Sequence, residues 1–168
     1  MGIRQIAVER FSLISAKPFK EVMAVIDAAI GHPDMRQLVR EIAAAPTYAE
    51  MEKAIRKAAG TTNLLLFMRL DIGEVLNKGN AVAKLQSQRL LVGNPLIMRQ
   101  MTEQVPDAGS YAPVTILVDE RADGVHLSYD RMTSFLAPYQ SAEALRVATD
   151  LDLKVETLLK QAANESSV

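Results

Sequence analysis

Two alternating runs around an Asp-Gly pair constrain this chain more than any other feature. Residues 114–120 and 125–130 alternate apolar and polar side chains, and they flank Asp123-Gly124. This dipeptide favours a two-residue hairpin, because both central positions of a type I′ turn need a positive φ. The sequence therefore predicts two adjacent antiparallel strands, and one side of that pair has to be covered by the rest of the chain. The side chains of this apolar face are Ile116, Val118, Val125, Leu127 and Tyr129.

The opposite face of the hairpin carries an acid, a histidine and a serine. A turn centred on the Asp-Gly pair would place Arg121 opposite His126 and Asp119 opposite Ser128. These residue types occur in hydrolases, but the serine lies in mid-strand and has neither a nucleophile elbow nor oxyanion donors around it. Exposure to solvent or contact in a dimer explains this face more simply.

Apolar spacing along the remaining chain predicts an α+β fold. Residues that recur at three and four positions indicate helices, and continuous or alternating apolar runs indicate strands. The expected order is β-α-(α-α)-β-β-α-β-β-α, a mostly antiparallel sheet packed on one side by helices. The further strands are expected at 6–15, 64–71 and 84–92, the helices at 18–30, 35–42, 48–59, 95–104 and 141–162, a polar turn at 73–79 and a loop at 106–113.

Length and composition favour one domain over the whole of residues 1–168. A chain of 168 residues with 49% hydrophobic residues can bury a core without cross-links. The sequence has no cysteine, which excludes disulfides, thiolate nucleophiles and cysteine-based metal sites. The net charge of −1 gives no attraction to nucleic acid or to anionic membranes. We expect a frayed tail at 164–168 and, because no signal peptide or membrane span is apparent, a cytoplasmic location.

Several short motifs resemble, in order and spacing, the domain of unknown function 302 family. They are Ser15-Ala16-Lys17-Pro18-Phe19, Leu70-Asp71-Ile72, the stretch from Arg89 to Pro95, the strand from Val114 to Glu120, Asp123-Gly124 and Tyr129-Asp130. The resemblance implies a fold similar to TATA-binding-protein-like domains, with a curved sheet around a helix, and a tendency to form homodimers. Relative to shorter members, residues 33–60 look like an inserted helical pair. The cysteine that some relatives place before Asn94 is absent, so a thiol role cannot apply here.

The first functional hypothesis is a homodimeric binding protein in which the curved sheet and the long C-terminal helix enclose a pocket for a small, partly apolar ligand. Gly93-Asn94-Pro95 could present free N–H groups to an anion at the start of a helix, with Arg89 and Arg99 nearby. Met98 and Met101 could form an adaptable apolar wall. The ligand-binding candidates are therefore Arg89, Asn94 and Met98, although a strand end followed by a helix cap explains the same motif.

Two other hypotheses remain open. An enzyme could use acid-base groups at one end of the sheet, and its candidate residues are Asp71, His126, Tyr129 and Asp130. A protein-interaction module could use the helical pair at 33–60, if that pair exposes an apolar stripe. His32 is expected to serve as a helix cap. A metal site at Asp71 and Glu74 is not favoured, and neither a cofactor nor a substrate can be assigned from the sequence.

Overall fold

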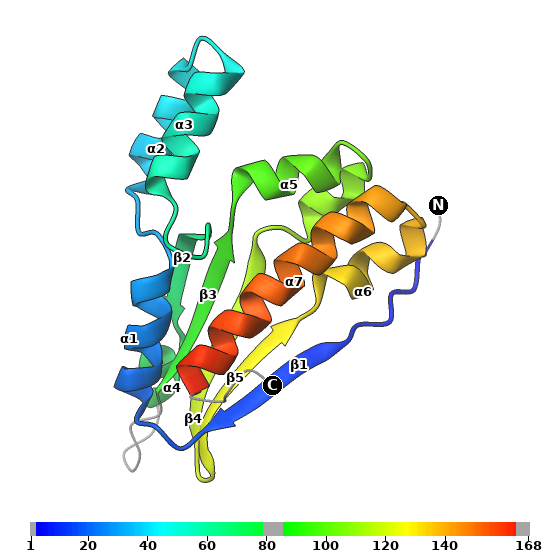
Figure 1. The fold of residues 1–168 in the computed structure, drawn as a ribbon. Helices are drawn as coiled ribbons and strands as arrows, with labels where there is room; N and C mark the ends of the chain where they lie inside the picture. The colour runs from blue at the N-terminus through cyan, green and yellow to red at the C-terminus, as the bar shows by residue number, and fades with distance from the viewer. Residues whose placement is uncertain (1–2, 79–85, 164–168) are drawn as a thin grey trace.

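The computed structural model describes residues 3–78 and 86–163, and it contains one five-stranded antiparallel sheet (Figure 1). The strand order across the sheet is β1-β5-β4-β3-β2. This arrangement confirms the predicted α+β class and the mostly antiparallel sheet. The strands are β1 (Arg10–Ser15), β2 (Leu65–Asp71), β3 (Ser87–Gly93), β4 (Val114–Arg121) and β5 (Gly124–Asp130).

Helices α1, α5, α6 and α7 cover one face of the sheet, and α7 crosses that face diagonally (Figure 1). The core is aliphatic, because the inward side chains of the strands meet the apolar stripe of α7. No described helix is both long enough and apolar enough to span a bilayer. The helices are α1 (Phe19–Ala29), α2 (Met35–Ala44), α3 (Tyr48–Ala58), α4 (Ile72–Asn77), α5 (Pro95–Thr102), α6 (Met132–Leu136) and α7 (Ala142–Ala163), with 3₁₀ turns η1 (Pro106–Ser110) and η2 (Ala137–Tyr139).

The hairpin between β4 and β5 forms as predicted, but its register differs by two residues. Arg121 lies opposite Gly124 and Asp119 lies opposite His126, so Ala122 and Asp123 are the turn residues. Among the described residues the turn has a positive φ only at Gly124, at 136°, so it is not the predicted type I′ turn. A Cβ at Gly124 would come within 2.7 Å of a main-chain oxygen of β1, so the glycine permits β1 to pair closely with β5. The predicted inward and outward faces are unchanged, because a shift of two residues preserves the alternation.

Helices α2 and α3 form a hairpin that projects away from the sheet (Figure 1). Asp34 and Thr47 cap the two helices with their side chains, as expected of short polar residues at these positions. At the base of the hairpin, the main-chain N–H groups of Gly31 and Gly60 both donate to the carbonyl oxygen of Leu64, at 2.8 and 3.1 Å. The entering and leaving chains therefore cross in direct contact, with no space for a side chain on either glycine.

Several predicted boundaries are wrong, and the reasons are local. The first strand begins at Arg10 rather than at residue 6, because β5 ends at Asp130, which is the partner of Arg10. The predicted polar turn at 73–79 is largely helix α4, since the Asp71 carboxylate caps its first turn. The predicted loop at 106–113 contains η1, and the sequence did not indicate α6. Residue 79, the predicted strand start at 84 and the predicted frayed tail at 164–168 lie outside the described residues.

Candidate functional site

The face of the sheet opposite α7 carries exposed apolar side chains together with charged and hydroxyl groups. Strand alternation gives this face, here called the outer face, one side chain from every second residue. Three large apolar side chains on it are 41% to 51% exposed, namely Ile14, Met68 and Leu70. Charged and hydroxyl groups lie on the same face, from Arg10, Asp130 and Thr115 on neighbouring strands. The outer face is therefore mixed in character and is not covered by the helices on the opposite side.

A shallow depression of about 220 Å³ lies on this outer face, and we call it the outer-face hollow. Strands β1, β5, β4 and β3 and the first residue of α4 all contribute to it. Leu117 and Ile72 give it apolar walls, and Thr115 and Ser128 give it hydroxyl groups. Its lining residues are Arg10, Ile72, Arg89, Thr115, Leu117, Ser128, Tyr129 and Asp130.

The charges of the hollow are only partly neutralised. Arg10 forms two hydrogen bonds to the Asp130 carboxylate, Nε to Oδ1 at 2.6 Å and Nη2 to Oδ2 at 2.8 Å. These hydrogen bonds, more than the simple charge attraction, hold the pKa of Asp130 below its usual value. Arg89 has only a hydrogen bond of 3.2 Å to the neutral Thr115 hydroxyl, and no described carboxylate lies within 4 Å of its guanidinium. The hollow therefore carries one uncompensated positive charge.

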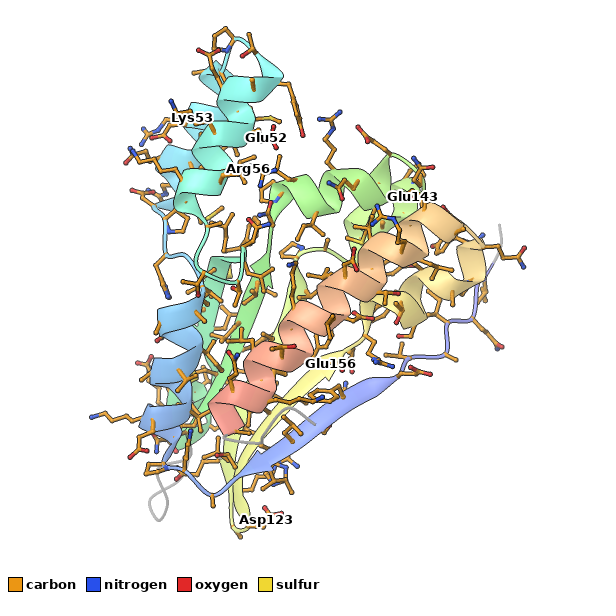
Figure 2. All side chains as sticks on the ribbon, viewed as in Figure 1. Glu52, Lys53, Arg56, Asp123, Glu143 and Glu156 are labelled. Carbon is orange, nitrogen blue, oxygen red and sulfur yellow. The ribbon has the colours of Figure 1, made fainter. Side chains whose placement is uncertain are left out.

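The four candidate acid-base residues do not come together. Asp71 caps α4, with its Oδ1 accepting from the Glu74 N–H at 2.8 Å. His126 Nε2 lies 2.7 Å from Asp123 Oδ1 near the tip of the β4–β5 hairpin, where Figure 2 shows Asp123. Asp130 pairs with Arg10 on the outer face, and the Tyr129 hydroxyl points to the opposite face of the sheet. Each side chain already has a structural partner, so the expected cluster at one end of the sheet does not form.

The suspected hydrolytic set is also divided. The Asp119 carboxylate pairs with Arg121 at 2.6 Å, and His126 pairs with Asp123. Ser128 lies opposite Leu117 in the register, so it is not directly opposite Asp119. The three residues share the outer face as predicted, but they do not form a nucleophile–base–acid chain.

The three ligand-binding candidates separate into two places. Asn94 is buried and caps α5 itself, since its Oδ1 accepts from Leu96 N–H at 2.8 Å and its amide donates to Asn63. Met98 lines a small apolar niche against α7 with a free volume of about 10 Å³, which is room for about one water molecule. The expected pocket between the sheet and α7 is therefore filled by the core. Only Arg89 lies in an open depression, and Arg99 is engaged with Glu103.

A buried polar network on the helical face was not found from the sequence. The Asp152 carboxylate, 3% exposed, accepts hydrogen bonds from the Tyr129 hydroxyl at 2.5 Å and from Met132 N–H at 2.7 Å. It also accepts from the Thr133 N–H at 3.1 Å and from the Thr133 hydroxyl at 2.6 Å. Burial first, and the neighbouring Asp152 charge second, raise the pKa of Tyr129. Because every oxygen of the carboxylate is engaged, this network fixes α6 on α7 and offers no free group for catalysis.

A second charged group lies next to this network. Arg131 donates to Glu156 at 2.7 Å and to Glu9 at 3.2 Å, and Glu156, labelled on α7 in Figure 2, is a largely buried acid. The sequence did contain a signal for both acids, because Asp152 and Glu156 lie within the apolar stripe of α7. An acid in such a stripe indicates a buried partner. Within residues 3–78 and 86–163, no three acidic, histidine or cysteine side chains gather as a metal site would require.

Comparison with known proteins identifies a family model that matches the sequence and a solved structure with a similar fold. The family model described as "Domain of unknown function DUF302" matches residues 40–162. The crystal structure of the uncharacterized conserved protein DUF302 from Bacillus stearothermophilus is similar, with a TM-score of 0.58 and 11% sequence identity. That similarity covers 94% of this chain and 98% of the other, and at this identity it shows the fold alone. No curated protein matches the sequence.

Proposed function

The chain belongs to the DUF302 family, which is described only as a domain of unknown function, and from this premise we propose that it is a cytoplasmic homodimeric binding protein. Its ligand is small and partly apolar, and it binds in the outer-face hollow. The observation that carries the proposal is the composition of that hollow, in which apolar walls from Leu117 and Ile72 stand beside two hydroxyl groups and an uncompensated arginine. Apolar walls with a few directed polar groups are typical of ligand sites.

The size of the hollow limits the ligand. Pockets for drug-sized molecules measure roughly 300 to 1,000 Å³. The outer-face hollow, at about 220 Å³, is smaller and shallow. A ligand of modest size would therefore remain partly exposed on a single copy of the chain, and a second copy over the outer face would enclose it.

The exposed apolar side chains of the outer face support a second copy as its cover. Five strands about 4.8 Å apart, with about six residues of 3.3 Å rise each, give a face of about 480 Å². Two stacked copies would bury about 1,000 Å², which is the lower limit for a specific interface. The face also pairs Arg10 with Asp130 and Arg121 with Asp119, so that these charges do not cause repulsion between two identical faces.

The alternatives have less support. An enzyme mechanism would need the candidate acid-base groups in mutual reach, and each is engaged elsewhere. An interaction module would need an apolar stripe on α2 and α3. Among their described residues the large exposed apolar side chains are Val39 and Tyr48, and the Tyr48 ring already lies against Arg99. Figure 2 shows charged side chains, including Glu52, Lys53 and Arg56, on α3.

Ligand binding is tested by screening the purified chain against a metabolite library by thermal shift, followed by native mass spectrometry of the hits. Binding only to the native state raises the midpoint of unfolding. We expect hits that lose their shift when Leu117 is changed to Trp, whose larger neutral side chain fills the hollow, and keep it when Val39, on the projecting hairpin, is changed to Trp. A screen without any stabilising compound, or with hits insensitive to Leu117→Trp, would contradict the proposal.

Dimer formation is tested separately by sedimentation equilibrium. Met68 and Val39 are similarly exposed, at 50% and 58%, but only Met68 lies on the outer face. We expect the wild-type chain to sediment as a dimer, Met68→Lys to weaken association, and Val39→Lys to leave it unchanged. A monomeric wild-type chain at high protein concentration would refute this part.

A further inference from the structure

The charge balance of the outer-face hollow restricts the chemistry of its ligand. Two guanidinium groups and one carboxylate line the hollow, from Arg10, Arg89 and Asp130. The Arg10–Asp130 pair is bidentate and has no charge left to neutralise. Arg89 is exposed, and its one hydrogen bond to another described residue goes to a hydroxyl group, so its charge and most of its N–H donors are available.

We infer that the ligand of the outer-face hollow carries a carboxylate, which Arg89 binds as a two-point ion pair. This inference rests on the proposed function and specifies its ligand class. A guanidinium offers two parallel N–H donors in one plane, and a carboxylate offers two acceptors with the matching separation. The hydroxyl of Thr115, which accepts from Arg89 at 3.2 Å, holds the arginine at the strand surface and can itself donate to the bound anion.

The walls and the charge count favour a monocarboxylic acid with a short apolar body over a phosphate. Leu117 and Ile72 offer apolar surface next to Arg89, which suits an aliphatic chain. A phosphate carries close to two negative charges and usually requires several cations or a nest of N–H groups. Among the described residues of the hollow a single cation is free, and the main-chain N–H groups of strands β3 and β4 are already used in the sheet.

The test uses hexanoate as the probe and hexanamide as its neutral counterpart, titrated into the ¹⁵N-labelled chain and followed by amide chemical shifts. We expect saturable shifts at residues around the hollow, with hexanoate binding at least about tenfold more tightly than hexanamide. Arg89→Gln should weaken hexanoate binding at least about tenfold and leave hexanamide binding unchanged. Arg121→Gln is the matched control, because it removes the same charge from the outer face outside the hollow, and it should change hexanoate binding less than about twofold.

Three outcomes would overturn the inference: equal affinities for hexanoate and hexanamide, full hexanoate affinity in Arg89→Gln, or displacement of hexanoate by an equal concentration of inorganic phosphate. Its failure can be told apart from failure of the proposed function. If the library screen finds hits in the hollow that are neutral, the carboxylate is wrong and the binding function stands. If hexanoate binds through Arg89 in a chain that sediments as a monomer, the carboxylate site is supported and only the dimer is lost.

Discussion

Replacing Asp152 by Asn tests whether the buried network holds the C-terminal half of the fold together. The wild-type carboxylate accepts four hydrogen bonds, two at each oxygen, and all four come from Tyr129, Met132 and Thr133. Asparagine has the same shape but offers one acceptor oxygen and one NH₂ donor. The NH₂ group of the amide would therefore face two other donors. Because Asn has the same shape as Asp, the substitution creates no cavity, and the change in stability reflects the hydrogen bonds alone.

The expected loss follows from the hydrogen bonds that cannot be remade. Of the two orientations of the asparagine amide, the one with the NH₂ group directed at Thr133 costs less free energy. In that orientation the Thr133 hydroxyl can rotate to accept a hydrogen bond, whereas the Thr133 N–H cannot. One buried donor then lacks a partner, and the remaining bonds lose their charged acceptor, which costs about 2 kcal/mol in the free energy of unfolding. Asp152→Ala removes the whole acceptor and should cost about 3 to 5 kcal/mol.

Urea unfolding followed by far-ultraviolet circular dichroism measures both effects. Asp150→Asn is the matched control, because it makes the same change two residues away on α7, where the side chain is 62% exposed and pairs with Arg146. We expect the control to lie within about 0.5 kcal/mol of wild type. If Asp152→Asn is as stable as the control, the carboxylate does not hold α6 on α7.

Three further predictions concern other parts of the fold. Because Arg10 holds the pKa of Asp130 below its ordinary 3.8, the pair stabilises the fold above that pH and loses its contribution as the pH falls through the lower, folded-state value. Asp130→Asn should therefore lower the free energy of unfolding by at most about 1 kcal/mol at pH 7, with a difference that shrinks as the pH falls below 3.8; a difference that does not change with pH would contradict the ion pair. Gly60→Ala would bring a Cβ within 2.4 Å of main-chain atoms and should cost at least about 2 kcal/mol in urea unfolding, whereas Gly109→Ala, with its nearest contact at 3.6 Å, should be close to neutral. The two segments at the base of the α2–α3 hairpin donate to one carbonyl oxygen, so a glycine-serine linker of about four residues in place of 33–59 should still unfold in a single transition at lower stability; loss of that transition would show that the helical pair is not a removable insertion.

The sequence by itself determined the main elements and their faces. Alternation in 114–120 and 125–130 predicted both strands and their inward side chains, and the apolar stripe of 141–162 predicted α7. These patterns are local, since the side-chain period of a strand or helix is a property of its own backbone. The motifs from Ser15 to Asp130 also pointed to the family that the family model supports. Short elements such as α4 and α6 were missed, because caps from Asp71 and Asp152 stabilise them rather than apolar periodicity.

The candidate site was decided by the tertiary structure. Of the seven candidate residues, Arg89, Tyr129 and Asp130 border the outer-face hollow, and the Tyr129 hydroxyl itself points to the other face. The sequence could identify each polar group but not its partner, since Arg10 meets Asp130 only when the first strand pairs with the fifth, 120 residues away. Whether a charge is neutralised or left available depends on such long-range pairing, because electrostatic attraction acts through space and not along the chain. The free charge on Arg89 therefore depends on how the strands pair in the sheet, whereas the sequence shows only that the residue is an arginine.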